Sequence, residues 1–210
     1  MKDLVIIGAG DFGRETMWYA RRMNEAEPTW NILGFVDDGK VGQTIDGYPV
    51  LGGVDWLAAY PQEVYATTAI ADGHVKEKIW TKLAANPNVR AGTIIDPSAI
   101  ISKDSVIEEG CIFAAGTVVS VAAHVGRHCI VNIHGTVGHD VVIEDYCTVH
   151  PATNIAGFVR IGTRSLIGIG TKIIQGLSIA PDTIVGAGAV VVRSITESGT
   201  YAGVPAKRIK

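Results

Sequence analysis

The chain has 210 residues, of which 47% are apolar and 19% are charged, and its formal net charge is −3. This balance provides no basic surface for binding nucleic acid, and no apolar run approaches the roughly 20 residues that a membrane-spanning helix needs. The first residues enter a strand pattern directly, without the long apolar stretch and cleavage site of a signal peptide, so we expect a cytoplasmic protein. The length allows one domain or two.

Strand-like and helix-like segments alternate along the first part of the chain. We predict strands over residues 4–8, 31–37, 48–51 and 63–69, and helices over residues 12–25, 54–60 and 75–85. Such alternation is typical of a parallel sheet with helical crossovers. All four tryptophans precede residue 81, and this change in composition predicts a boundary near residue 90. We therefore expect an α/β domain over residues 1–88, a repeat domain over 89–196 and a C-terminal tail over 197–210.

A glycine-rich turn, with Gly8, Gly10 and Gly13, lies between the first predicted strand and the first predicted helix. Asp37 and Asp38 end the next strand, where a dinucleotide-binding fold places the carboxylate that binds a ribose. Backbone N–H groups at a helix N-terminus favour any phosphate, and this part of the chain is too short for a full two-halved dinucleotide fold. We therefore expect a mononucleotide-type ligand in preference to NAD, with a purely structural tight turn as the other alternative.

From Ile95 to Val191 an aliphatic or aromatic residue occupies every sixth position without a break. A helix repeats every 3.6 residues and a strand every two, so neither element keeps this period. A six-residue repeat is typical of a parallel β-helix, whose thin coils must stack on one another. Spaced three hexapeptides apart, the cysteines are expected to form one column of small buried side chains, not a metal or redox site. The column comprises Cys111, Cys129 and Cys147, continued by Ser165 and Thr183.

Five of the six histidines lie close together in the repeat, namely His124, His128, His134, His139 and His150. His139 precedes Asp140, and an imidazole next to a carboxylate suits a general base. With three hexapeptides in each coil, Gly157 lies one coil above His139, about 5 Å along the axis. Its amide would be placed to donate to a developing oxyanion. We expect His124 and His128 to be turn or solvent residues.

A zinc site is the alternative for this cluster. His134 and His139 are five residues apart, a spacing similar to the zinc-binding pair of the trimeric hexapeptide carbonic anhydrases. In those proteins a third histidine lies two coils earlier, where this chain has Ser98 or Lys103. Since the third ligand is missing, we expect no metal. His150 lies one coil above Asn132 and is a further candidate for ligand contact.

Together the motifs resemble the bacterial sialic-acid and nucleotide-sugar acetyltransferases, a subfamily of the hexapeptide-repeat acyltransferases. The matching segments are Val5-Ile-Ile-Gly-Ala-Gly-Asp-Phe-Gly-Arg-Glu15, Gly34-Phe-Val-Asp-Asp38, Asn132 with His139-Asp140, Val185-Gly-Ala-Gly-Ala-Val-Val191 and Ala202-Gly-Val-Pro-Ala-Lys207. The resemblance implies a Rossmann-like α/β domain followed by a left-handed parallel β-helix. It also implies assembly into a homotrimer.

The resemblance further implies the roles of individual residues. His139 is the general base at a subunit interface, Asp140 sets its basicity and Gly157 receives the thioester carbonyl. Acetyl-CoA is the cosubstrate, lying between two subunits against Asn132, Thr148, Gly157, Ile169, Ala187 and Lys207. A nucleotide-linked sugar binds at Gly8, Gly10, Asp11, Phe12, Asp37 and Asp38, and its amine reaches His139 of an adjacent subunit.

One position departs from the family pattern. The family often has a histidine where this chain has Thr148, and we expect the side chain of His150, two residues on, to leave on the opposite face. The implied activity is acetyl transfer to the amine of a nucleotide-linked amino sugar. O-acetylation of a sialic acid or another sugar hydroxyl is one alternative, and a non-catalytic nucleotide-binding trimeric scaffold is another.

Overall fold

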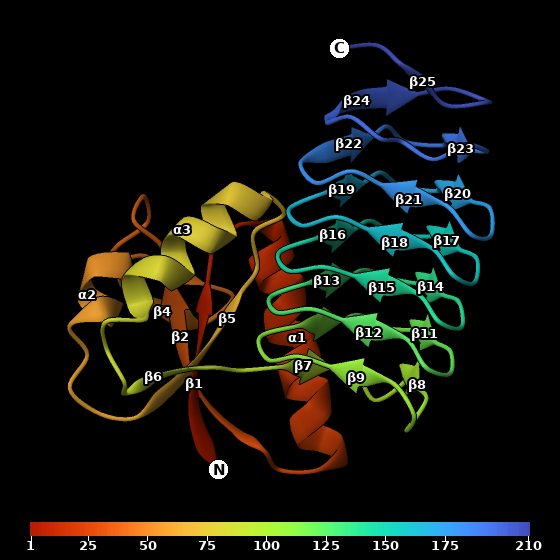
Figure 1. The fold of residues 1–210 in the computed structure, drawn as a ribbon. Helices are drawn as coiled ribbons and strands as arrows, with labels where there is room; N and C mark the ends of the chain where they lie inside the picture. Colours follow the sequence, from red (N-terminus) through yellow and green to blue (C-terminus); the bar gives the residue numbers. More distant parts are fainter.

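The computed structural model of the chain describes residues 1–210 and consists of an α/β part beside a tall β-helix (Figure 1). A six-stranded sheet, in the order β3-β4-β2-β1-β5-β6, forms the centre of the α/β part. Its strands are β1 (Lys2–Ile7), β2 (Trp30–Val36), β3 (Thr44–Ile45), β4 (Tyr48–Gly52), β5 (Val64–Thr68) and β6 (Val89–Ala91). All neighbours pair in parallel except β3 with β4. The expected α/β architecture is confirmed, with β3 and β6 as strands that the sequence did not predict.

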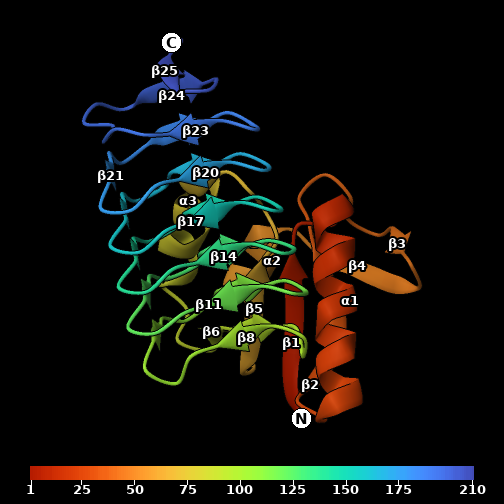
Figure 2. The same cartoon turned by 90° about the vertical axis from the view of Figure 1, so that its right-hand side faces the viewer.

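Three helices cover the sheet, namely α1 (Asp11–Ala26), α2 (Val54–Ala58) and α3 (Gly73–Leu83). Helix α1 lies along the lower coils of the β-helix (Figure 2), where Tyr19 and Ala20 share an apolar cluster with Ile112 and Ile130 of those coils. Helix α3 begins two residues earlier than predicted because the Asp72 side chain accepts from the N–H of Val75 and caps it. None of the three helices is long and apolar enough to cross a membrane.

The β-helix is built from short strands that form three parallel sheets. The first sheet contains β7 (Ile94–Ile95), β10 (Ile112–Phe113), β13 (Ile130–Val131), β16 (Thr148–Val149), β19 (Leu166–Ile167) and β22 (Thr183–Val185). The second contains β8 (Ile100–Ile101), β11 (Val118–Val119), β14 (Thr136–Val137), β17 (Asn154–Ile155), β20 (Lys172–Ile173) and β23 (Val190–Val191). The third contains β9 (Val106–Ile107), β12 (His124–Val125), β15 (Val142–Ile143), β18 (Arg160–Ile161) and β21 (Ser178–Ile179).

The coils wind with a left hand, as the resemblance implied. Ile112 pairs with Ile130, which pairs with Thr148, so each coil contains three hexapeptides. At the top, β24 (Gly199–Ala202) pairs with β22 and then with β25 (Lys207–Arg208), so the end of the chain adds to the first sheet. The division into domains stays a prediction.

The cysteine column is confirmed as a ladder inside the coils. Cys111, Cys129 and Cys147 are buried, and their Sγ atoms lie 3.1, 3.0 and 3.1 Å from the carbonyls of Gly126, Glu144 and Gly162. Ser165 repeats this contact with the carbonyl of Ala180 at 3.1 Å. The side chains therefore satisfy turn carbonyls within the core.

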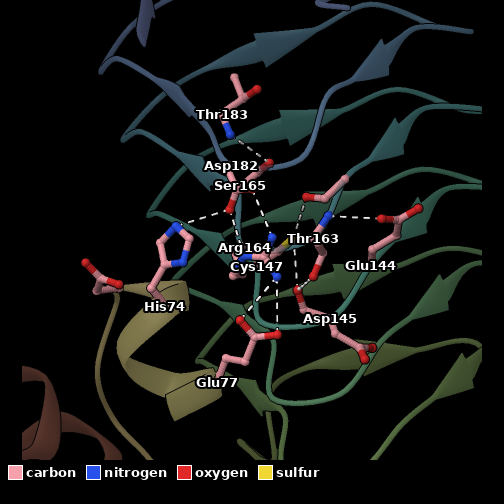
Figure 3. Close-up of polar contacts among 12 residues, drawn as sticks. His74, Glu77, Glu144, Asp145, Cys147, Thr163, Arg164, Ser165, Asp182 and Thr183 are labelled. Atoms are coloured by element: carbon pink, nitrogen blue, oxygen red, sulfur yellow. Dashed lines mark hydrogen bonds and ion pairs between the residues drawn. The ribbon is translucent and has the colours of Figure 1, made fainter. Parts of the chain in front are cut away.

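A second column of residues lies outside the coils and binds α3. We define the α3 column as His128, Tyr146, Arg164 and Asp182, which occupy the same corner of successive coils, each with positive φ. Arg164 donates to both Asp182 and Glu77, and His74 lies 3.2 Å from Asp182 (Figure 3). Since Glu77 and His74 are on α3, these contacts attach the helix to the β-helix turn by turn.

His128 is a turn residue, as expected, and it is buried. The residue is 5% exposed, and its ring lies between those of Trp80 and Tyr146, with ring centroids 4.2 and 5.3 Å away. Trp80 comes from α3, so docking of that helix buries the imidazole. His124, by contrast, is 49% exposed and lies near Glu108.

Candidate active site

His139 and Asp140 lie in the turn between β14 and β15, with their side chains in contact. Nδ1 of His139 is 2.9 Å from Oδ2 of Asp140. Because a carboxylate only accepts hydrogen bonds, Nδ1 carries the proton of the neutral ring and Nε2 keeps a free lone pair. The two side chains are 45% and 44% exposed. An incoming group can therefore reach Nε2 and give it a proton.

Gly157 occupies the same corner one coil further on. A Cβ atom at Gly157 would lie 2.4 Å from Nε2 of His139, so only glycine leaves room for the imidazole. The N–H of Gly157 donates to no other group of the chain. A free amide beside an imidazole with an unprotonated nitrogen is suited to bind an oxygen that becomes negative during a reaction.

Exposed apolar side chains border this corner. Val121, one coil below His139, is 49% exposed, and Phe158 is 54% exposed. The ring of Phe158 meets the imidazole of His139 edge-on, with centroids 4.9 Å apart. Apolar side chains around a polar pair are typical of a surface that another molecule covers.

A cavity of about 670 Å³ lies between α1 and the β-helix, and we call it the α1 cavity. Its lining includes Asp11, Phe12, Glu15 and Trp18 from α1, and Asn132, Thr148, His150 and Ile169 from the β-helix. Two residues predicted to bind the sugar nucleotide and three predicted to bind acetyl-CoA thus meet in one cavity. Trp18 and Glu15 also line the cavity, although the sequence did not predict them as binding residues. Nothing in a helix sequence shows which of its faces will meet a β-helix.

The expectation for His150 is wrong, because its side chain and that of Thr148 line the same cavity. Residues two apart along a strand project from the same side, and this pattern continues from β16 into the turn. Burial, followed by the charge of Lys76, lowers the pKa of His150. The imidazole is therefore neutral at neutral pH and offers one donor and one acceptor.

The charges around the α1 cavity are mainly negative. Asp11, Glu15 and Asp46 line it together with a single cation, Arg14. Arg14 binds Asp46 at 2.7 Å and lies 3.7 Å from Asp11. The remaining excess of carboxylate favours a ligand group that is positively charged, such as an ammonium.

A second cavity, of about 410 Å³, lies at the carboxyl ends of the central strands beside α3, and we call it the α3 cavity. Gly8, Asp37 and Asp38 line it together with Lys78 and Lys82. Clefts at this edge of a parallel sheet are common sites for nucleotides. The structure therefore brings together three of the residues predicted to bind the sugar nucleotide.

The two aspartates also hold the loops around the α3 cavity. Asp37 accepts from the N–H groups of Ala9 and Gly39, each at 2.9 Å. Asp38 accepts from the N–H of Val54 at 2.7 Å. Asp37 thus binds an amide of the glycine-rich turn, which leaves fewer of those amides for a phosphate. Gly10 caps α1 and lines neither cavity.

The loop between β5 and α3 separates the two cavities. Ile70 lines the α3 cavity and Ala71 lines the α1 cavity. The hydroxyl of Thr148 donates to the carbonyl of Ala71 at 2.8 Å, which ties the loop to the β-helix. The loop therefore contributes one residue to the wall of each cavity.

His139 and Gly157 line neither of these cavities. His139 follows the second sheet of the β-helix, whereas the wall of the α1 cavity comes from the first sheet and the turn after it. Ala187 and Lys207 are exposed and also lie outside both cavities. One chain thus holds the catalytic candidates and the cavities at different corners.

The structure contains no group of three His, Cys, Asp or Glu side chains that could hold a metal ion. The N–H and the hydroxyl of Ser98 donate hydrogen bonds to the carboxylate of Asp96, at 2.8 and 2.6 Å. The hydroxyl also accepts from the N–H of Gly116 at 3.0 Å. Ser98 thus takes part in the turn of its own coil.

Known proteins resemble the chain over its whole length. Residues 3–83 match the family model described as the PglD N-terminal domain. A GDP-perosamine N-acetyltransferase of Escherichia coli O157:H7 is 32% identical over 184 residues, covering 87% of this chain and 82% of the relative. PerB from Caulobacter crescentus, in complex with CoA and GDP-perosamine, superposes with a TM-score of 0.91 and 30% identity over 100% of this chain and 98% of that one.

A third similar protein is the acetyltransferase domain of PglB from Neisseria gonorrhoeae FA1090 in complex with acetyl coenzyme A. It is 29% identical, with a TM-score of 0.91 over 99% of this chain and 99% of that one. A left-handed β-helix with a histidine–aspartate pair at one corner and an α/β part alongside defines an acyltransferase of the hexapeptide-repeat class. The chain belongs to the bacterial sugar acetyltransferases of that class, as its motifs implied.

Proposed function

We propose that the protein transfers the acetyl group of acetyl-CoA to the amine of a nucleotide-linked amino sugar. The observation that carries this proposal is the corner at which His139, Asp140 and the free amide of Gly157 meet. The activity named for the Escherichia coli relative supports an amine acceptor. The ligands named for the solved relatives support acetyl-CoA as cosubstrate.

Each group at the corner has a step in the transfer. The amine nitrogen attacks the thioester carbonyl carbon and forms the new C–N bond, while Nε2 of His139 takes a proton from that nitrogen. The N–H of Gly157 donates to the carbonyl oxygen as it becomes negative. When the C–S bond breaks, the imidazolium returns its proton to the departing thiolate. Asp140 holds the ring in the required tautomer throughout.

The two cavities suit the two ends of the acceptor. The nucleoside lies in the α3 cavity near Asp37 and Asp38, and the diphosphate crosses the β5–α3 loop. The amino sugar then enters the α1 cavity beside Phe12, where the excess of carboxylate attracts its ammonium form. The ammonium releases one proton to solvent, and the neutral amine is the form that attacks the thioester. This placement is supported by the neighbouring residues Ile70 and Ala71, of which one lines the α3 cavity and the other the α1 cavity.

A second subunit has to complete this site. The α1 cavity contains no His139 of its own chain, and the exposed Val121 and Phe158 give the His139 corner an apolar border. We infer a homotrimer in which His139 of one subunit faces the α1 cavity of the next. Asn132, Thr148, Ile169, Ala187 and Lys207 are proposed to line the acetyl-CoA groove between subunits. Light scattering after size exclusion should give three times the chain mass of 22.2 kDa, and a fully active monomer would contradict the inference.

The decisive test is a thiol-release assay with acetyl-CoA against GDP- and UDP-linked amino sugars, with sialic acid as the hydroxyl acceptor. We expect turnover with at least one amino sugar nucleotide, and mass spectrometry should locate the acetyl group on nitrogen. His139→Asn should lower kcat by about a hundredfold or more, whereas His124→Asn, at an exposed histidine, should not. Binding of both ligands without any turnover would instead favour the non-catalytic scaffold.

A further inference from the structure

Lys76, on α3, has a fully buried side chain, with 0% of its surface exposed. Its Nζ atom donates to the carbonyl of Cys147 and to the hydroxyl of Thr148, both at 3.0 Å. These partners are neutral, and Lys76 forms no ion pair with any carboxylate. A buried ammonium without a counter-charge is costly, and buried lysines are normally paired.

No carboxylate around Lys76 supplies that counter-charge. On its own helix, Asp72 is committed to the N-cap, accepting from the N–H of Val75 at 3.0 Å. The β-helix presents the imidazoles of His128 and His150 and the cysteine column, in which Cys129 raises the pKa of Lys76 and has its own pKa lowered with Lys76 among the causes. Burial lowers the pKa of Lys76 to about 8. The amine thus remains mainly protonated at neutral pH and is ready to lose its proton in mild alkali.

Lys76 lies directly behind the loop that separates the two cavities. Its partner Thr148 lines the α1 cavity and donates to the carbonyl of Ala71, which lines the same cavity. The next residue back, Ile70, lines the α3 cavity. The charge of Lys76 also contributes to lowering the pKa of His150, so its field reaches the cavity wall.

We propose that the diphosphate of the bound sugar nucleotide is the missing counter-charge of Lys76, which makes Lys76 a positioning residue for the acceptor. The inference rests on the proposed function, because it places the diphosphate on the β5–α3 loop. Lys76 positions the diphosphate in two ways. Its hydrogen bond to Thr148 holds the hydroxyl that binds the carbonyl of Ala71, and its charge attracts the phosphates through space. Because the amine of Lys76 is fully buried, salt screens its attraction for the phosphates less than it would screen that of a surface lysine.

A purely structural tether would behave differently. It would need the two hydrogen bonds of Lys76 but not its charge, so ligand affinity would not follow the protonation of the amine. If the charge matters, bound diphosphate stabilises the protonated amine and raises its pKa above that of the free protein. By linkage, affinity must then fall as the pH rises through the pKa of the free protein, near 8.

The experiment titrates the full chain with GDP and with UDP by calorimetry, at about pH 7 and about pH 9. Guanosine and uridine serve as uncharged probes, and acetyl-CoA serves as the second ligand. The variants are Lys76→Met, which removes the charge, and Lys76→Arg, which keeps it at both pH values. Lys103→Met, at an exposed lysine of the first coil, is the matched control. Melting temperatures verify that each variant folds.

We expect the affinity of the wild-type protein for at least one nucleoside diphosphate to weaken severalfold between the two pH values. Lys76→Met should bind it about tenfold more weakly at neutral pH, without pH dependence. Lys76→Arg should restore tight binding and also remove the pH dependence. Affinities for the nucleosides, and those of Lys103→Met, should not change.

Three outcomes with the Lys76 variants would overturn the inference. They are unchanged diphosphate affinity in folded Lys76→Met, equal losses for diphosphates and nucleosides, and a loss confined to acetyl-CoA. A wild-type protein that binds neither diphosphate would overturn it as well. Failure of the proposed function would be seen in a different experiment. In that case no amino sugar nucleotide would be acetylated in the thiol-release assay.

Discussion

Replacing His128 by phenylalanine is expected to make the protein less sensitive to mild acid. Burial between Trp80 and Tyr146, followed by the charges of Lys76 and Arg127, lowers the pKa of His128 to about 3 from its ordinary value of 6.5. Below pH 6.5, therefore, His128 binds a proton in the unfolded chain but remains unprotonated in the folded protein until the pH approaches its lowered pKa. Stability consequently falls as the pH decreases from this value towards the folded pKa.

The magnitude follows from the two pKa values. Linkage gives a loss of about 2 kcal/mol between about pH 8 and about pH 5 for this one imidazole. Phenylalanine should fit, because Phe158 already occupies the equivalent left-handed turn position with φ 59°, against 56° for His128. The Nδ1 atom of His128 has no hydrogen-bond partner, so no bond through that atom is lost.

The assay is urea denaturation of the wild-type protein and of His128→Phe at both pH values. The unfolding free energy of the wild type should decrease by about 2 kcal/mol more than that of the variant. His124→Gln, at an exposed histidine, is the control and should follow the wild type. Equal losses in wild type and His128→Phe would refute the reasoning, because other titrating groups cancel in the comparison.

Three further predictions concern the His139 corner and the α3 column. Gly157→Ala should lower kcat by about a hundredfold, because the new Cβ would lie 2.4 Å from Nε2 of His139 and would displace the imidazole. Acetyl-CoA turnover measures this effect, and unchanged turnover would exclude Gly157 from the site. Asp140→Asn should lower kcat by about tenfold or more through loss of the ring orientation, with little change in the KM for acetyl-CoA; normal kcat would show that the contact is incidental. Arg164→Met should lower the unfolding free energy by about 1–2 kcal/mol, since it leaves Asp182 and Glu77 without their cation; an unchanged urea midpoint would mean that solvent screens these pairs fully.

The sequence by itself determined everything that depends on the repeat. A parallel coil places residue i+18 directly above residue i, so Gly157 beside His139 and the cysteine column could be predicted by counting. The elements of the α/β part were also predictable, because strands and helices carry local signals in apolar pattern and caps. The left hand of the coils came from resemblance, since periodicity is the same for both hands.

Only the tertiary structure decided how the two parts meet. The burial of His128 by Trp80, the contact of Lys76 with Thr148 and the walls of the α1 cavity all join residues from elements that share no period. No local pattern specifies which corner of a β-helix a helix will contact, because docking depends on the fit of two complete surfaces. The placement of His139 away from the cavities of its own chain belongs to this second group, and it is the reason that a second subunit is proposed to complete the site.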